Sequence, residues 1–338
     1  MNSNRRITSD RIVRADRASV VRAARLIADG GLVAFPTETV YGLGADASNE
    51  SAVMRIFEAK RRPADHPLIV HVADLASAQR WSSAMPAGAR ALAAAFWPGP
   101  LTLIVPRAAH VHDAVTGGQA SVGLRVPAHA VAHALLAEFG GGIAAPSANR
   151  FGHVSPTTPQ HVADDLEAAV DLILDGGACD IGIESTIVAF TGVAPMLLRP
   201  GGISADAIAA VLGHQPLAAD ATAPRASGTL ASHYATRTPA QLVATDALRA
   251  ELAQLADRDE RVAVLARTAA APEEFDGVWR NAPHDADGYA RTLYANLRAL
   301  DNSGVDAILI EQVPDDNAWA AIRDRLARAT AGVDDDRD

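Results

Sequence analysis

Cysteine is nearly absent from this chain, because Cys179 is the single thiol in 338 residues. One thiol excludes an intramolecular disulfide framework and suits a reducing compartment. Cys179 follows a Gly-Gly-Ala run, and this context favours a small residue in a turn over a nucleophile. We therefore expect a cytoplasmic protein without disulfides.

Long apolar runs and positive charge are also scarce. No apolar run approaches the roughly 20 residues of a membrane-spanning helix, and residues 1–14 lack the apolar stretch of a secretory signal. The acidic residues 334–338 are typical of a solvated terminus. The net charge of -10 argues against a broad grip on a nucleic-acid backbone. We expect no membrane partner and no stable nucleic-acid partner, while a local basic pocket for a small polyanion remains compatible with this charge.

Several catalytic signatures are missing. The sequence has no Gly-x-x-x-x-Gly-Lys-Ser/Thr phosphate loop, no Gly-x-Ser-x-Gly nucleophile elbow and no His-Glu-x-x-His zinc motif. His129 and His133 are four residues apart, but no third metal ligand is evident near them. The sequence therefore predicts no metal site made by protein side chains. It favours chemistry driven by positioning and charge neutralisation around phosphates.

Hydrophobic patterning divides the chain into three parts. Helices and strands intermix over residues 1–213, which predicts an α/β domain with a twisted, mixed sheet flanked by helices. Residues 214–239 are rich in Pro, Ala, Thr and Ser and are typical of a linker. Residues 240–333 alternate strand and helix more regularly, which predicts a smaller Rossmann-like α/β domain. No Gly-x-Gly-x-x-Gly turn follows its strands, so no dinucleotide site is expected there.

Specific helix boundaries and strands are also readable. Asp16 to Asp29 fits a helix that ends at Gly30, and Asn49 can cap a second helix that Pro63 stops. Residues 31–35 and 68–72 fit buried strands. Residues 36–44, which follow the first of these strands, carry hydroxyls and two glycines. They suit a loop that a ligand approaches closely, although an ordinary turn explains them equally well.

Two further clusters carry positive charge. Residues 60–71 place Lys60 and two arginines between a helix and a strand, which suits a polyphosphate clamp, although the helix dipole alone explains cations at that position. His71, within the strand, is also compatible with an ordinary core histidine. Arg125 alternates with apolar residues and therefore needs an anionic partner, either a fixed Asp or Glu or a ligand carboxylate.

The last cluster follows another buried strand. Ser147 and Asn149 come directly after the strand at residues 143–145, and further polar motifs follow at residues 152–156, 184–186 and 198–202. Side chains there suit phosphate or metal-bound water, and turn formation is the alternative.

Taken together, the order and spacing of these motifs resemble the Sua5/YrdC/YciO family of threonylcarbamoyl-adenylate synthases, in its longer two-domain Sua5 form. The motifs are Pro-Thr-Glu-Thr-Val-Tyr-Gly-Leu from Pro36, Lys-x-Arg-Pro from Lys60, Pro-Ser-Ala-Asn up to Asn149 and Glu-Ser-Thr up to Thr186. Residues 232–235 are similar to the start of the family's His-Tyr-Ala-Pro element, with Thr236 in place of its proline.

The resemblance implies a YrdC-like catalytic domain and synthesis of L-threonylcarbamoyl-AMP and pyrophosphate from L-threonine, bicarbonate and ATP. It implies Mg²⁺ accompanying ATP, and a separate transferase that places the group on adenosine 37 of tRNA. The implied threonine-side residues are Thr39, His71, Arg125, Ala145 and Ser185. The implied nucleotide-side residues are Lys60, Arg62, His66, Ser121, Ser147, Asn149, Ser155, Arg199 and, as a lid from the linker, Tyr234. Lys60 and Arg62 are the implied catalytic pair, which neutralises the triphosphate.

Two other functions remain open at this point. One is an RNA-binding module of the same fold, against which the negative net charge argues. The other is a related adenylating enzyme that uses carbamoyl phosphate, but such relatives carry zinc-finger segments that a chain with one cysteine lacks.

Overall fold

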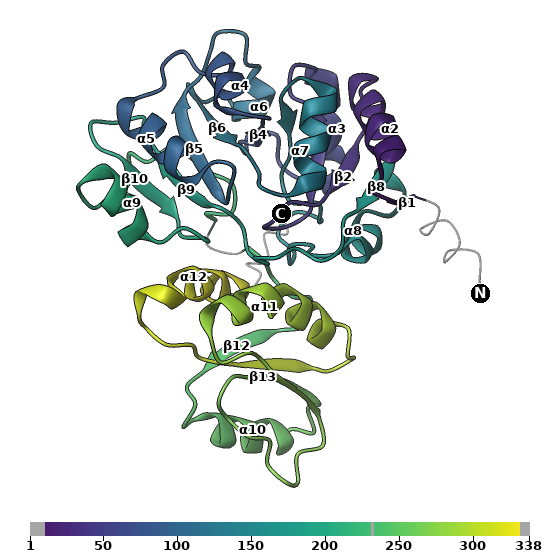
Figure 1. Cartoon of the computed structure of the whole chain (residues 1–338). Coiled ribbons are helices and arrows are strands. Elements are labelled where there is room, and N and C mark those ends of the chain that lie inside the picture. Colours follow the sequence, from purple (N-terminus) through teal and green to yellow (C-terminus); the bar gives the residue numbers. More distant parts are fainter. Residues whose placement is uncertain (1–10, 231–232, 332–338) are drawn as a thin grey trace. The chain divides into compact units, whose positions relative to one another are not determined.

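The computed structural model describes residues 11–230 and 233–331 (Figure 1). Residues 1–10, Ser232 and the acidic residues 334–338 lie outside the described residues, so the expectations for them are not addressed. The chain divides into two compact units. The first unit is Met1–Phe151 with Ser155–Thr229, and the second is Gly152–Val154 with Leu230–Asp338. The boundary after Thr229 lies inside the segment that the sequence assigns to the linker.

The first unit is built on an eleven-stranded mixed sheet of order β1-β8-β2-β3-β7-β4-β6-β5-β9-β10-β11. Its strands are β1 (Ile12–Arg14), β2 (Val33–Phe35), β3 (Gly42–Asp46), β4 (Ile69–His71), β5 (Leu101–Pro106), β6 (Ser121–Arg125), β7 (Ile143–Ala144), β8 (Leu172–Asp175), β9 (Thr186–Ala189), β10 (Met196–Arg199) and β11 (Leu217–Ala218). Five neighbouring pairs are parallel and five antiparallel, so the predicted mixed sheet is confirmed.

Helices pack onto this sheet through two apolar clusters. The first-unit helices are α2 (Arg17–Ala28), α3 (Glu50–Lys60), α4 (Leu75–Arg80), α5 (Ala87–Phe96), α6 (Asp113–Thr116), α7 (Ala130–Phe139), α8 (Pro159–Leu166) and α9 (Ala205–Leu212), with a 3₁₀ turn η1 (Glu167–Ala169). Helices α2 and α7 bury their apolar faces together with β2 and β8. The larger cluster joins α3, α5, α8 and α9 to the sheet.

The capping signals read from the sequence are confirmed. The Asp16 side chain accepts a hydrogen bond from the Ser19 amide and begins α2, and the Asn49 side chain accepts one from the Ala52 amide and begins α3. Gly30, just beyond α2, has φ +83°, a left-handed conformation that glycine adopts without strain.

The interpretation of residues 36–44 as a loop is partly wrong, because Gly42 and Gly44 lie in strand β3, paired with β2. A Cβ on Gly44 would lie 2.8 Å from carbon atoms of both Phe35 and Ile143. Close packing against neighbouring side chains therefore requires glycine at this position, rather than the approach of a ligand.

The second unit contains a four-stranded, all-parallel sheet of order β12-β15-β13-β14. Its elements are β12 (Ala240–Val243), α10 (Leu248–Ala256), β13 (Val262–Ala266), β14 (Val278–Asn281), α11 (Ala286–Asp301), β15 (Ala307–Glu311), η2 (Asn317–Trp319) and α12 (Ala320–Ala329). This arrangement confirms the predicted Rossmann-like α/β class. Helices within the described ranges are too short or too polar to cross a membrane.

At the carboxyl end of β15, the Glu311 side chain occupies the strand-end position where such sheets often bind anions. Burial alone would raise the pKa of Glu311, but hydrogen bonds from Thr268, Ala269 and Arg267 lower this pKa to about 2. A carboxylate of the chain itself therefore satisfies these backbone N–H groups.

Candidate functional site

Three neighbouring strands of the first unit, β7, β4 and β6, position three of the threonine-side residues. His71 ends β4 and is paired with Arg125, which ends the parallel strand β6. Ala145 follows β7, and its amide donates to the Ile69 carbonyl at 2.9 Å. The spacing along the sequence is large, but the strand register brings the three strands together: His71 lies opposite Arg125 of β6 and Ile143 of β7, and Ala145 lies beside Ile69 at the other end of β4.

Arg125 has an internal anionic partner. Its Nη2 lies 2.7 Å from Oε1 of Glu38, and both side chains are buried. Burial alone would raise the pKa of Glu38, but the Arg125 charge and its hydrogen bond lower it. Of the two partners that the sequence leaves open, the fixed carboxylate is the one observed. The interpretation in which a ligand carboxylate alone balances Arg125 therefore needs correction.

His71 is a neutral imidazole. Its side chain is buried, its ring packs edge-on against Phe35, and its Nδ1 has no hydrogen-bond partner among the described residues. Burial, followed by the nearby charge of Arg125, lowers the pKa of His71 to about 3. At neutral pH the ring therefore offers an unused hydrogen-bonding nitrogen at the carboxyl end of β4.

The lowered pKa of His71 makes the stability of the first unit sensitive to acid. Unfolding returns the pKa of His71 from about 3 to about 6.5, so the unfolded chain binds an extra proton between these values. The free energy of unfolding should consequently fall by about 2 kcal/mol between pH 7.5 and pH 5 through this group. Urea unfolding at the two pH values measures the change. In His71→Asn this contribution should vanish, and an unchanged pH dependence would contradict the assignment.

The remaining threonine-side residues lie in hydroxyl clusters. The Oγ1 atoms of Thr39 and Thr37 are 2.8 Å apart, next to the Glu38 that pairs with Arg125. Ser185 Oγ lies 2.8 Å from Thr102 Oγ1. Both threonine-side residues are buried, so their hydroxyl groups are held in fixed positions by their neighbours.

Lys60, at the end of α3, is fully enclosed and holds the loop after β7. Its Nζ donates to the carbonyl oxygens of Ser147 at 2.6 Å and Asn149 at 2.5 Å, and lies 3.4 Å from Asn149 Oδ1. Burial, followed by the charge of Arg62, lowers the pKa of Lys60 well below its usual value. These contacts favour a role in positioning the loop over the direct neutralisation of phosphate that the resemblance implies.

The loop that Lys60 holds also carries three of the other nucleotide-side residues, Ser147, Asn149 and Ser155. Asn149 is fully buried, and its Nδ2 donates to the Arg150 carbonyl. Ser147 is half-buried. The Ser155 hydroxyl donates to Glu184 at 2.6 Å. The Asn149 and Ser155 side chains thus contribute hydrogen bonds that hold the loop itself.

The side chains of Arg62 and His66 both contact the ring of Phe151. The guanidinium carbon of Arg62 lies 5.4 Å from the centre of the Phe151 ring, and the His66 ring lies 5.1 Å from it. Arg62 also donates to the Pro67 carbonyl at 3.0 Å. Burial and the Arg62 charge lower the pKa of His66. Phe151 therefore brings together two side chains that the resemblance assigns to the nucleotide side.

Arg199 connects the two sides of the predicted site. Its guanidinium donates to the carbonyl and hydroxyl of Ser185, which the resemblance assigns to threonine, and to the carbonyl of Ser227. It therefore contacts both a threonine-side residue and the segment that crosses the sheet after β11.

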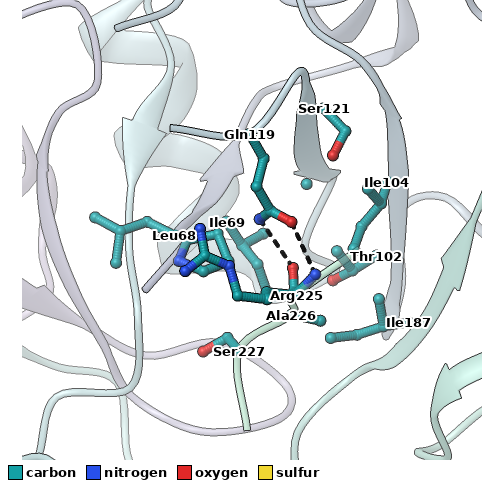
Figure 2. A pocket seen from close by; sticks show the side chains of 12 residues that line it. Leu68, Ile69, Thr102, Ile104, Gln119, Ser121, Ile187, Arg225, Ala226 and Ser227 are labelled. Carbon is teal, nitrogen blue, oxygen red and sulfur yellow. Dashed lines mark hydrogen bonds between the residues drawn. The ribbon is translucent and has the colours of Figure 1, made fainter. Parts of the chain in front are cut away.

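Residues 225–227 of that segment line a small pocket together with Gln119 and Ser121 (Figure 2). Gln119 Oε1 accepts from the Arg225 amide at 2.8 Å, and Gln119 Nε2 donates to the Arg225 carbonyl at 3.1 Å. The cavity measures about 10 Å³, enough for one water molecule. A nucleotide base cannot enter this pocket unless the segment moves.

Removing the Gln119 side chain should loosen this segment. Loss of two hydrogen bonds worth about 1 kcal/mol each should increase the fraction of molecules in which this segment is open by roughly tenfold or more. We expect Gln119→Ala to increase the rate of tryptic cleavage after Arg225 by about that factor, as followed by mass spectrometry. Cleavage after the exposed Arg249 serves as the internal control. Equal rates of cleavage after Arg225 in the wild type and in Gln119→Ala would show that Gln119 does not hold this segment in place.

Tyr234 lies in the second unit. Its ring is buried and stacks on Tyr294 of α11 at 5.5 Å, while Arg325 of α12 lies 5.3 Å from the ring centre. Its backbone has φ +63°, which is uncommon for a residue other than glycine. Contact between Tyr234 and a nucleotide stays a prediction.

Sequence reasoning did not select three residues of the site: Glu38, Phe151 and Glu184. The requirement for a partner of Arg125 was a signal for Glu38, which lies in the first motif. Phe151 gave no comparable signal, because only the fold brings it to Arg62. In the described part of the chain, no group of three or more His, Cys, Asp or Glu side chains is arranged to hold a metal ion.

Comparisons with known proteins identify the family of this chain. A family of Sua5, YciO and YrdC domains, described as telomere recombination, matches residues 25–201. The threonylcarbamoyl-AMP synthase C-terminal domain matches residues 203–331. The threonylcarbamoyl-AMP synthase of Bacillus subtilis is 40% identical over 329 residues, covering 93% of each chain. That of Pyrococcus abyssi is 39% identical over 323 residues, covering 91% of this chain and 93% of that protein.

Solved structures extend the likeness to three dimensions. The P. abyssi Sua5 structure complexed with L-threonine superposes with a TM-score of 0.87 at 37% identity, covering 94% of this chain and 96% of that one. A variant of the same protein, with an adjacent histidine and tyrosine replaced by alanine, superposes equally well. The chain therefore belongs to the Sua5 family of threonylcarbamoyl-AMP synthases, in its two-domain form.

Proposed function

We propose that this chain makes L-threonylcarbamoyl-AMP and pyrophosphate from L-threonine, bicarbonate and ATP. The observation that carries the proposal is the pairing of His71 with Arg125 at the carboxyl ends of β4 and β6, in the same unit as the buried cation Arg62. This set offers charge and hydrogen bonds without an activated nucleophile, and it suits an adenylation that forms no covalent enzyme intermediate.

On the threonine side, the amino acid binds at the strand ends. The neutral His71 can accept a hydrogen bond from the threonine amine through Nδ1, which no described protein group uses. Arg125 bonds to Glu38 and Gly99 through Nη2 and Nε, so Nη1 is directed to the threonine carboxylate in this proposal. Thr39, Ala145 and Ser185 complete the set.

On the nucleotide side, Arg62 neutralises the charge of the triphosphate and His66 helps to orient it, with Ser121, Ser147, Ser155 and Arg199 as further contacts. Lys60 and Asn149 hold the loop that carries two of these serines. Mg²⁺ would be supplied together with ATP, because two carboxylates of the motifs, Glu38 and Glu184, already pair with Arg125 and Ser155. The ion would add charge neutralisation.

The reaction then needs two bond-forming steps. The free amine of threonine takes up bicarbonate as a carbamate, with loss of water. A carbamate oxygen attacks the α-phosphorus of ATP in line, the bond to the β-phosphate bridging oxygen breaks, and pyrophosphate leaves. The residues of the chain bind, orient and neutralise, and none of them is covalently modified.

The product is an activated mixed anhydride, so a second enzyme must consume it. We propose a tRNA threonylcarbamoyl transferase in the cytoplasm as that partner, acting at adenosine 37. This division of labour is supported by the net charge of -10, which disfavours stable tRNA binding by this chain.

Double labelling tests the proposed function. With ¹⁴C-bicarbonate and α-³²P-ATP, one chromatographic product should carry both labels, and it should form only when L-threonine is present. A product carrying ³²P without ¹⁴C would contradict the proposed reaction.

A further inference from the structure

The second unit includes Gly152–Val154, three residues that lie in the sequence between two stretches of the first unit. The Ala235 amide donates to the Gly152 carbonyl at 2.9 Å, and His153 forms an isolated parallel bridge with Ala235. The Arg298 guanidinium donates to the Val154 carbonyl across 144 residues of sequence. Residues of the second unit therefore bind the backbone of this short segment at its beginning, middle and end.

One face of helix α11 organises these contacts. Tyr294 and Arg298 are four residues apart, so their side chains lie on the same side of the helix. Tyr294 stacks on the ring of Tyr234, which directly precedes Ala235. Arg298 binds Val154 itself. The helix thus holds the segment directly through Arg298 and indirectly through the backbone beside Tyr234.

Both flanks of the segment belong to the nucleotide side of the first unit. Phe151 immediately precedes the segment. Its ring contacts the side chains of Arg62 and His66, and its amide donates a hydrogen bond to the Lys60 carbonyl. Ser155, immediately after it, donates to Glu184. Because only three residues separate Phe151 from Ser155, fixing the segment restricts the positions of both.

We propose that the second unit serves the reaction through its contacts with Gly152–Val154. Arg298 is the positioning residue: it fixes this segment and, because the chain is continuous, also restricts the adjacent Phe151 and Ser155. The proposal rests on the proposed function, because it takes Arg62, His66 and Ser155 as contacts of ATP. Among the described contacts, the threonine-side residues His71 and Arg125 make none with this segment or with its flanking residues. Loss of these contacts should therefore raise the KM for ATP and leave the affinity for threonine nearly unchanged.

Kinetics of Arg298→Ala in the full-length chain test the proposal. Loss of one hydrogen bond worth about 1.4 kcal/mol should raise KM for ATP about tenfold. The dissociation constant of L-threonine, measured by calorimetry without ATP, should change less than about twofold. Arg298→Lys keeps a cationic donor and should recover most of the loss. Arg249→Ala, at an exposed arginine of α10, is the matched control.

Hydrogen exchange adds a measurement that does not depend on activity. Amides of residues 152–156 should exchange faster in Arg298→Ala than in the wild type or Arg249→Ala. If Arg298→Ala does not fold, Arg298→Gln, which keeps a shorter N–H donor, should show the same direction in both measurements. If the wild type is active but Arg298→Ala changes neither the KM for ATP nor the exchange of residues 152–156, the proposed positioning role of Arg298 is wrong. A wild type without threonine-dependent ATP turnover would instead contradict the proposed function.

Discussion

Replacing Arg62 by glutamine should lower kcat/KM for pyrophosphate release by about 10²–10³-fold, the usual cost of removing one preorganised charge from a transition state. Arg62 is the buried arginine of the Lys-x-Arg-Pro motif, and it stacks on Phe151. Glutamine removes the charge but keeps an N–H group for the Pro67 carbonyl. Release of pyrophosphate at saturating L-threonine and bicarbonate, with ATP varied, gives the ratio.

The adjacent Arg61 provides a matched control, because it is exposed and caps α3. Arg61→Gln removes the same charge one residue away and should stay within about twofold of the wild type. Comparable losses in the two variants would mean that general electrostatics, rather than a contact made by Arg62, governs the rate. The thermal melting curve of Arg62→Gln shows whether folding accounts for any loss.

Replacing Arg125 by methionine should destabilise the first unit by about 3–5 kcal/mol, because it leaves the Glu38 carboxylate buried without its partner. Hydrogen exchange in urea, followed in peptides from β2, β3 and β6, reports the stability of this unit separately from the second. Activity should be lost as well, since Arg125 is also the proposed threonine contact.

The double variant Glu38→Gln with Arg125→Met separates the two roles of Arg125. Removal of both charges should restore most of the lost stability, because no uncompensated charge then stays buried. Activity should not return, because the proposed carboxylate contact is still missing. If the single variant loses less than about 1 kcal/mol, the ion pair does not stabilise the fold as described.

The fold class was predictable because local signals agree with the tertiary structure. Asp16 and Asn49 lie at the helix starts that the sequence indicates, and the apolar periodicity places α2 and α3 correctly. Strand β3 was not predicted, since Gly42 and Gly44 are typical of a turn. Only the packing of Phe35 and Ile143 against the strand explains these glycines.

The chemical character of the site was also readable in part. The motifs around Lys60, Arg125 and Asn149 identify the clusters, but the partners of each side chain depend on contacts far apart in sequence. Arg125 and Glu38 are 87 residues apart, and Lys60 Nζ reaches the Asn149 carbonyl across 89 residues. Sequence spacing within one strand or helix carries no information about such pairs, so the contacts between Lys60 and the loop after β7 are visible only in the structure.

The most direct test of the account is an omission assay for pyrophosphate release with the purified chain and ATP. The complete mixture should release pyrophosphate, and omission of either L-threonine or bicarbonate should reduce the rate to background, because the carbamate that attacks ATP needs both. Pyrophosphate release at the full rate without threonine, or without bicarbonate, would contradict the account.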